Sequence, residues 1–583
     1  MRIMGIGDGF GAGVALVEDG VVRFAVSEER LSRIKNHSGY YHGFPDRSIR
    51  AGFETTGWEP DTIDQIAISN FAFPPFPLRL RSLSRNRPRE DKEFLDRHEF
   101  SQTLNSRLYS VFSERVSSSR MAKWSTSVYR PALSRKLKRD HGIDAKIVFF
   151  DHHRCHATSA YLTQPMDDCL AVTMDCHGDG LSGSVSIASG GKLTRIASFP
   201  ATDSLGSFYA AITNHLGFQH HRHEGKVTGL AAYGDPTPVD ADMRRMIHYD
   251  PETRKFSTAL GRNQFVSIAR VGSFLSKNYR PEDIAAAAQN HLERMVLQII
   301  TSFLAETGKS KIVLAGGIFG NVKLNQRIKD LPGVDYMFIQ PGMGDEGLCV
   351  GAALSLSASL GSFRLERIDN VFWGPSYSER EIEKALASYD FPHERLPEIE
   401  PRIAQLLAEK KTVARFDGRL EFGPRALGNR SILFHTGDPS VNDWLNKLLK
   451  RTEFMPFAPA TLNSRAKDCY ENLAPAEYAA EFMTVCFDCR PGFAQRSPAV
   501  VHVDGTARPQ LVGEKNHPSF HKILTEYERL TGNPSVINTS FNIHEEPIVC
   551  TPDDALRAFT MADLDYLALG NYLVARSNRS AAR

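Results

Sequence analysis

Long hydrophobic runs are missing from this sequence. In its 583 residues no apolar stretch approaches the roughly 20 residues that a helix needs to cross a bilayer. The opening residues, Met1 to Gly7, contain one charge followed by glycines, and they lack the extended apolar core of a signal peptide. We therefore expect a cytoplasmic protein that has no membrane partner.

A strong excess of one charge is also missing. The 70 lysines and arginines nearly balance the 68 aspartates and glutamates, which leaves a net charge of +2 at pH 7. This balance gives no support for nucleic acid as a partner. Apolar residues make up 42% of the chain, which is enough for large buried cores, and the length predicts two to four domains.

Cysteines are few, and their spacing is not that of a zinc site. The chain has eight, and the single C-x-x-C pair, Cys486 and Cys489, has no second pair of ligands at similar spacing. We expect ordinary core or surface thiols. The sequence also shows no internal repeat and no low-complexity tract.

Short apolar runs that end in glycine-rich turns are present in several places. Asp19-Gly20 separates two such runs and predicts a β-hairpin. The runs Leu170 to Met174 and Lys311 to Ala315 end at Asp175 and at Gly316-Gly317. Turns of this kind let backbone amides approach a phosphate closely. Together with helical segments between them, they predict an α/β core that handles a nucleotide.

Residues 73–140 have a different, basic composition, with five arginines between positions 79 and 89. We interpret this stretch as a helical insertion on the surface. Three roles remain open at this point: a solvated basic face, a rim for an anionic or bulky substrate, or an RNA-binding surface. The aromatic residues expected among the basic residues of an RNA binder are sparse.

The sharpest local motif is a pair of histidines, His152 and His156, four positions apart. On a helix this spacing puts both imidazoles on one face, where they can bind one metal ion. Asp175 and Asp345 each follow an apolar run and could complete the site. Imidazole with carboxylate suits Fe(II), Mn or Zn better than Ca. From spacing alone, a structural or surface H-x-x-x-H pair is equally compatible.

A change of composition near residue 366 predicts a second domain. Its most distinctive segment, from Asp417 to Ser431, follows an apolar run and combines glycines, arginines and a serine. Such a turn fits an oxyanion pocket, because arginine can clamp a phosphate with two hydrogen bonds. Surface ion pairs are the alternative. A third turn, Asn538 to Asn542, follows another apolar run.

Taken in order, the motifs at 152–157, Asp175, 316–321 and 342–347 resemble the O-carbamoyltransferases of antibiotic and nodulation-factor biosynthesis. The resemblance implies an α/β protein with an N-terminal actin/hexokinase-like (ASKHA) domain of two lobes over residues 1–365. It implies a C-terminal YrdC-like α/β domain over residues 366–583. The insertion at 73–140 is the part of the chain that the resemblance does not cover.

The resemblance also implies an activity. Carbamoyl phosphate and ATP, with Mg²⁺, give carbamoyl adenylate, and the carbamoyl group then passes to a hydroxyl of a small-molecule acceptor, a sugar or a macrocycle. Fe(II) or another divalent metal is implied at His152, His156, Asp175 and Asp345. A homodimer is compatible with the family. The residues that match cofactor-binding positions are Lys226, Gly316, Gly317, Asn321, Arg419, Arg425, Asn429, Arg430, Lys450, Arg451, Asn538, Ser540 and Asn542.

Two departures from the family pattern concern the chemistry. Relatives carry a histidine in the first hairpin, where this chain has Gly9-Phe10-Gly11-Ala12-Gly13. Relatives also carry an extra arginine where Thr452 to Met455 stand. The substitutes we predict for catalysis are Asp8, Lys35, His37 and His223. Two other functions stay open: a tRNA threonylcarbamoyl-type enzyme, and a non-catalytic scaffold that binds a metal or nucleotide.

Overall fold

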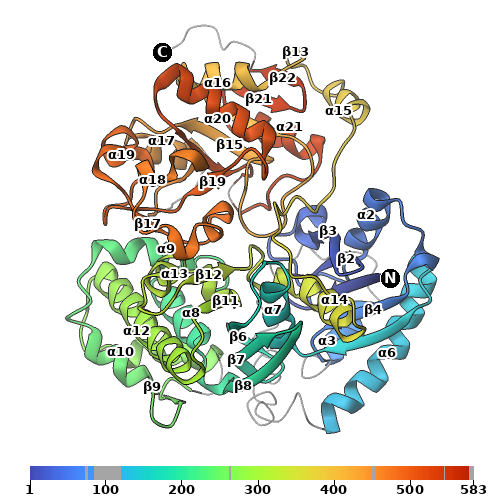
Figure 1. The fold of residues 1–583 in the computed structure, drawn as a ribbon, viewed down its shortest axis with the longest axis vertical. Helices are drawn as coiled ribbons and strands as arrows, with labels where there is room; N and C mark the ends of the chain where they lie inside the picture. The colour runs from blue at the N-terminus through green and yellow to red at the C-terminus, as the bar shows by residue number, and fades with distance from the viewer. Residues whose placement is uncertain (72–75, 84–119, 262–263, 449–453, 544, 577–583) are drawn as a thin grey trace. The chain divides into compact units, whose positions relative to one another are not determined.

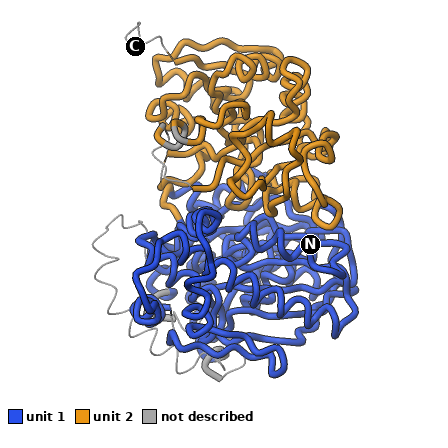
Figure 2. Tube along the Cα trace, turned by 90° about the vertical axis from the view of Figure 1, so that its left-hand side faces the viewer, with its two compact units in different colours: residues 1–32, 36–367 blue, residues 33–35, 368–583 orange. Residues whose placement is uncertain are grey.

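The computed structural model describes residues 1–71, 76–83, 120–261, 264–448, 454–543 and 545–576. The chain divides into two compact units, shown in Figure 2. Unit 1 contains Met1–Ser32 and Asn36–Arg367, and unit 2 contains Arg33–Lys35 and Ile368–Arg583. In the part of the chain that the structure describes, no helix is long and apolar enough to cross a membrane.

Unit 1 contains two five-stranded sheets that share one topology (Figure 1). In each, three consecutive strands pair antiparallel, and two later strands continue the sheet in parallel from the first of the three. The first sheet has the order β3 (Val21–Ser27), β2 (Gly13–Glu18), β1 (Arg2–Gly7), β4 (Gln65–Ser69), β5 (Lys146–Phe150). The second has the order β8 (Lys192–Pro200), β7 (Leu181–Ser189), β6 (Cys169–Gly178), β11 (Lys311–Ala315), β12 (Tyr336–Ile339).

This repeated topology lies in the backbone, and the sequence shows no internal repeat that would have predicted it. The α/β class and the two-lobed N-terminal part are confirmed. The predicted hairpin is also present: β2 pairs with β3, and Asp19 and Gly20 both have a positive φ, as a tight hairpin turn requires.

Helices connect the strands of unit 1. They are α1 (Glu28–Ser32), α2 (Asp46–Thr56), α3 (Phe76–Leu83), α6 (Arg120–His141), α7 (His152–Tyr161), α8 (Leu205–His215), α9 (Glu224–Leu230), α10 (Asp240–Met246), α11 (Gln264–Arg270), α12 (Pro281–Thr307), α13 (Val322–Lys329) and α14 (Leu348–Ser359). The small pair β9 (Ile247–Asp250) and β10 (Lys255–Thr258) lies between α10 and α11.

Helix α14 packs against both β1 and α7, which brings the first sheet and the histidine helix together. Its residues are apolar or small on all sides, as is typical of a fully buried helix. Two glycines permit the close contact. A Cβ at Gly5 would lie 2.0 Å from the carbonyl oxygen of Cys349, and one at Gly351 would lie 1.9 Å from that of Cys155. The position of α7 therefore depends on this glycine packing.

Unit 2 is built on one eight-stranded mixed sheet. Its order is β13 (His393–Arg395), β22 (Tyr572–Ala575), β21 (Tyr566–Leu569), β14 (Val413–Phe416), β15 (Arg430–His435), β20 (Ser535–Ser540), β16 (Ala458–Leu462), β19 (Gln510–Val512). Helices α16 (Glu400–Ala408) and α20 (Pro518–Thr531) pack together and form a core with residues such as Leu433. The other helices of at least six residues are α15 (Glu379–Leu386), α17 (Val441–Leu448), α19 (Pro491–Arg496) and α21 (Pro552–Met561).

The basic insertion is helical where the structure describes it, in α3 and α6, and residues 84–119 lie outside the described residues. The expectation of a solvated basic face is wrong for two of its cations. Arg79 is fully buried and pairs with Asp8, and Lys136 is buried and pairs with Asp46 and Asp140. Asp8 and Asp46, which lie outside the insertion, supply counter-charge that the local composition does not show, and Asp140 supplies the rest from within it.

Candidate functional site

The histidine pair is placed by the start of α7. Strand β5 ends at Phe150, and Asp151 caps the helix by accepting a hydrogen bond from the Arg154 backbone N–H at 2.8 Å. His152 and His156 follow on one face, one turn apart, and both are buried. The expected helix is therefore present, and it holds both imidazoles inside unit 1.

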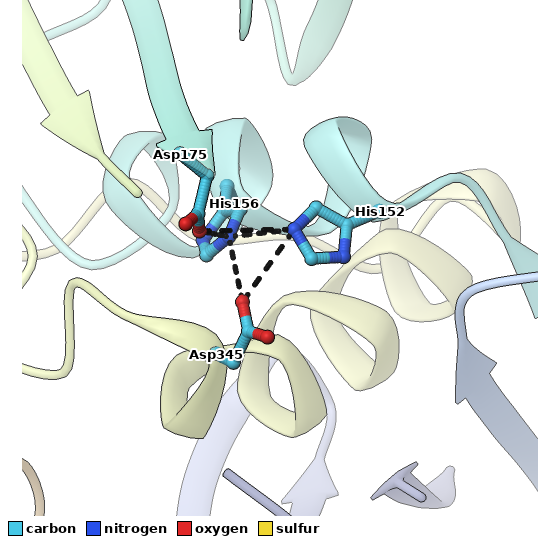
Figure 3. A group of neighbouring side chains, drawn as sticks. All are labelled: His152, His156, Asp175 and Asp345. Atoms are coloured by element: carbon cyan, nitrogen blue, oxygen red, sulfur yellow. Dashed lines mark hydrogen bonds and ion pairs between the residues drawn. The ribbon is translucent and has the colours of Figure 1, made fainter. Parts of the chain in front are cut away.

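Four side chains from three separate segments converge at this point (Figure 3). Their ligand atoms all lie within 4.8 Å of one another. The Nε2 atoms of His152 and His156 are 3.1 Å apart, and each is 3.5 Å from Oδ1 of Asp345. Oδ2 of Asp175, on β6, is 3.1 Å from Nε2 of His156 and 3.8 Å from Nε2 of His152. The structure thus brings together the four predicted metal ligands.

The local electrostatics fit a divalent cation at the centre of the four side chains. Oδ1 of Asp345 is buried without a hydrogen-bond partner among the described residues, and it faces both imidazoles. Burial disfavours the charged form of His156, but Asp175 and Asp345 outweigh it and raise the pKa of His156 to about 9. Two nitrogens and two carboxylates are a donor set that suits Fe(II), Mn or Zn.

His152 has two further partners, which the sequence analysis missed. Its Nδ1 lies 2.6 Å from Oδ1 of Asn70, and its backbone N–H donates to Oδ2 of Asp179 at 2.9 Å. Asn70 directly follows β4. The apolar run Ile66 to Ile68 before it was the available signal, but that strand was not predicted from the sequence.

The glycine turn after β11 contacts the same centre. Gly316 has a φ of 104°, and a Cβ there would lie 2.1 Å from the carbonyl oxygen of Met174, so no other residue fits. The backbone N–H of Gly317 donates to Oδ2 of Asp175 at 3.3 Å. Asn321 caps α13 through its side-chain oxygen, and its amide nitrogen donates to Gln289. Lys226, on α9, is buried.

The predicted proton acceptors already have partners of their own. Asp8 is fully buried, accepts two hydrogen bonds from Arg79 and accepts a third from the Tyr129 hydroxyl at 2.6 Å. The two ring nitrogens of His37 contact Ser32 and Gly43, and burial lowers the pKa of His37 to about 4. Asp8 and His37 are therefore part of the framework of unit 1.

The other two catalytic candidates are placed as follows. Nδ1 of His223 accepts a hydrogen bond from the Gln219 backbone N–H at 3.2 Å, so that nitrogen is already engaged. Lys35 groups with unit 2. The hydrogen bonds described above for Asp8, His37 and His223 all go to residues outside the histidine–aspartate quartet.

In unit 2 most of the predicted anion-binding side chains donate hydrogen bonds to backbone carbonyl oxygens of the same unit. The Arg430 guanidinium is buried over the Phe416 ring and donates to the carbonyl oxygens of Asp417, Gly418 and Asn429. The Asn429 amide donates to the carbonyl oxygen of Arg419 at 2.8 Å. The alternative of surface ion pairs is wrong for Arg430, which is buried and donates to the backbone of the turn after β14.

The remaining predicted residues of unit 2 have the following positions. Arg419 donates to the carbonyl oxygens of Trp373 and Gly374. Asn538 donates to Gln510, and Asn542 donates to the carbonyl oxygen of Glu546. Arg425 and Ser540 are half-buried, and Lys450 and Arg451 lie outside the described residues.

A cavity of about 190 Å³ opens beside the turn that follows β14. Its lining residues include Tyr377, Phe416, Asp417, Gly418 and Tyr572. Aromatic rings on its walls and a glycine at the strand end are features common in small-molecule sites.

Comparison with known proteins identifies the family. A model described as Carbamoyltransferase N-terminus matches residues 2–354, and one described as Carbamoyltransferase C-terminus matches residues 404–576. The chain belongs to the carbamoyltransferase family. Among curated proteins, nodulation protein NolNO of Sinorhizobium fredii is 33% identical, with 97% of this chain and 79% of the relative covered. An uncharacterized protein of Methanocaldococcus jannaschii is 32% identical, with 98% and 99% covered.

Among solved structures, full-length HypF in its phosphate- and nucleotide-bound form is similar to this carbamoyltransferase with a TM-score of 0.33 and 12% identity. The match covers 62% of this chain and 46% of HypF. A likeness of this size carries no argument, so the family membership rests on the sequence models and the curated relatives.

Proposed function

We propose that this carbamoyltransferase is an ATP-dependent O-carbamoyltransferase. The observation that carries the proposal is the convergence of His152, His156, Asp175 and Asp345 in unit 1 of a chain whose family transfers carbamoyl groups. Neither fact is sufficient alone. A metal-ligand quartet is compatible with many reactions, and the family models do not identify the group that accepts the carbamoyl.

The first half of the reaction activates the donor, and we assign it to unit 2. Water releases phosphate from carbamoyl phosphate, and an oxygen of the resulting carbamate displaces pyrophosphate from the α-phosphorus of ATP. The products are carbamoyl adenylate, pyrophosphate and phosphate, and Mg²⁺ accompanies the ATP. The mixed anhydride is the better donor because AMP is a good leaving group. The site we propose for this step is the turn that Arg430 contacts, with Arg425 nearby in the sequence and Ser540 opposite Ser431 on the paired strand β20.

The second half transfers the carbamoyl group, and we assign it to unit 1. His152, His156, Asp175 and Asp345 would hold Fe(II) or another divalent cation, which when bound supplies Lewis acidity toward carbonyl and phosphate oxygens. The Gly316-Gly317 turn brings backbone close to Asp175, where it can approach the adenylate. An acceptor hydroxyl attacks the carbamoyl carbon, loses its proton, and AMP leaves.

The acceptor class follows from the family and not from the geometry. A hydroxyl of a sugar or macrocycle is the acceptor we propose, and closure around the adenylate would protect it from hydrolysis. Lys226 is the residue of α9 that we propose to contact the nucleotide.

Incubation of the full-length protein with ATP and carbamoyl phosphate tests the proposal. We expect pyrophosphate and phosphate to be released in equal amounts, and only when carbamoyl phosphate is present. Threonine and bicarbonate are left out of the reaction. Pyrophosphate that appears only after they are added would indicate a threonylcarbamoyl-type enzyme, and no pyrophosphate under either condition would contradict the enzymatic assignment.

A further inference from the structure

The side chain of Asn70 contacts His152, one histidine of the quartet, and its backbone is hydrogen-bonded to Phe150, two residues before that histidine. Asn70 follows β4 directly and has a φ of 78°, in the left-handed region that few non-glycine residues adopt. Its backbone N–H donates to the carbonyl oxygen of Phe150 at 2.9 Å, which ties it to the end of the neighbouring parallel strand β5. Phe150 is separated from His152 by one residue, so Asn70 lies beside the start of α7.

The side-chain contact determines which nitrogen of His152 faces the other ligands. Oδ1 of Asn70 is 2.6 Å from Nδ1 of His152. An amide oxygen only accepts, so this pair requires the hydrogen of a neutral imidazole to be on Nδ1. The lone pair then lies on Nε2, the atom that faces His156, Asp175 and Asp345. Only an unprotonated nitrogen can bind a cation.

A second contact fixes the same pair of residues. The carboxylate of Asp179 accepts hydrogen bonds from the backbone N–H of Phe71, at 3.1 and 3.2 Å, and from the backbone N–H of His152, at 2.9 Å. Phe71 is the residue after Asn70. Asp179 therefore holds Phe71 against the first turn of α7. This contact keeps the side-chain amide of Asn70 beside the imidazole of His152.

We propose that Asn70 is a positioning residue for the metal centre: it selects the Nδ1–H tautomer of His152 and orients its Nε2 for a divalent cation. The proposal rests on the proposed function only in requiring that the quartet binds such a cation. Metal-ligating histidines commonly donate their other ring N–H to an oxygen, and loss of that partner typically weakens metal binding about 10- to 100-fold.

Asn70→Gly and Asn70→Asp separate the side chain from the backbone. Glycine accepts a φ of 78° without strain and removes only the amide, whereas alanine would add backbone strain. Aspartate keeps an oxygen acceptor at the same position. Asn472→Gly is the matched control, because Asn472 is an exposed asparagine of unit 2 with a φ of 49°.

The measurement is calorimetric titration of metal-free, full-length protein with Co²⁺, with the visible absorption of the bound Co²⁺ as a second readout. We expect Asn70→Gly to weaken Co²⁺ binding about 10- to 100-fold and to alter the spectrum. Asn70→Asp should bind at least as tightly as the unmodified protein, and Asn472→Gly should be unchanged in both readouts.

Two results overturn the proposal while leaving the metal centre intact. In one, Asn70→Gly binds Co²⁺ with unaltered affinity and spectrum. In the other, Asn70→Asp loses as much affinity as Asn70→Gly, which would mean that the amide donates to Nδ1 instead of accepting. Failure of the unmodified protein itself to bind Co²⁺ would overturn the metal centre and the role of Asn70 together. If Asn70→Gly fails to fold, the direction of change in Asn70→Asp decides alone.

Discussion

Replacement of Arg79 by methionine tests whether the helical insertion is anchored through a buried charge. Arg79 and Asp8 are both fully buried and make two hydrogen bonds, from Nε to Oδ2 at 2.9 Å and from Nη2 to Oδ1 at 2.7 Å. Methionine fills much of the same volume without charge. Asp8 would then remain as a buried carboxylate that has lost its ion pair with Arg79.

Loss of one partner from a buried ion pair typically costs about 3–5 kcal/mol. The Tyr129 hydroxyl still donates to Asp8 at 2.6 Å in this variant, so we expect the lower end, about 3 kcal/mol. With an m-value near 3 kcal/mol/M, this cost corresponds to a decrease of about 1 M in the urea midpoint of unit 1. Urea unfolding of the full-length protein, followed by circular dichroism, measures it.

The double variant Asp8→Asn with Arg79→Met supplies the control. It removes the unpaired charge, so it should recover more than half of the lost stability, as expected for two residues that interact directly. The reasoning is refuted if Arg79→Met has the midpoint of the unmodified protein, or if the second substitution lowers the midpoint further.

Three other substitutions test separate parts of the fold. Gly316→Ala should destabilise unit 1 far more than Gly333→Ala, because both have a positive φ but only Gly316 would bring a Cβ to 2.1 Å from Met174; urea midpoints compare them. Burial raises the pKa of Glu28 to about 7 from 4.5, so its contribution to stability is complete below pH 4.5 and is lost as the pH rises through 7, by about 3 kcal/mol. Glu28→Gln should therefore melt higher than the unmodified protein at pH 8 and lose this advantage by pH 4.5. Leu433→Ala should cost about 2–5 kcal/mol in the denaturant transition of unit 2, because Leu433 is fully buried in its core.

Local signals predicted the elements that carry the site. Asp19-Gly20 marked the hairpin, and the four-residue spacing of His152 and His156 marked a helical face. The structure also has a reciprocal capping box between Ser378 and Glu381 at the start of α15, a signal of the same local kind. Each of these signals involves residues that are close in the sequence, so it can be recognised without knowing the tertiary fold.

Contacts between distant segments were not predictable in the same way. Arg79 has basic neighbours in the sequence, yet it is buried because Asp8, 71 positions away, supplies the opposite charge. Asn70 contacts His152 across 82 positions and belongs to no motif. The predicted proton acceptors show the same limit. Asp8 and His37 have suitable side chains, but in the fold Asp8 accepts hydrogen bonds from Arg79 and Tyr129, and His37 contacts Ser32 and Gly43.

The two-sheet repeat of unit 1 shows the same limit at the level of the backbone. Strand order and direction repeat from the first sheet to the second, while the side chains on the strands differ. Hydrophobic patterning records which face of a strand is buried, and many sequences satisfy it. A topological repeat can therefore persist after every recognisable sequence repeat has been lost.

The division of labour between the two units is tested most directly by the His156→Ala variant. The unmodified protein and the variant are mixed rapidly with ATP and labelled carbamoyl phosphate, and pyrophosphate and transferred carbamoyl are measured separately, with a panel of sugar and macrocycle hydroxyls as acceptors. We predict that His156→Ala releases pyrophosphate in the same amount per chain during the first turnover but transfers no carbamoyl group to any acceptor. Carbamoyl transfer by His156→Ala at the rate of the unmodified protein would contradict the assignment of the quartet.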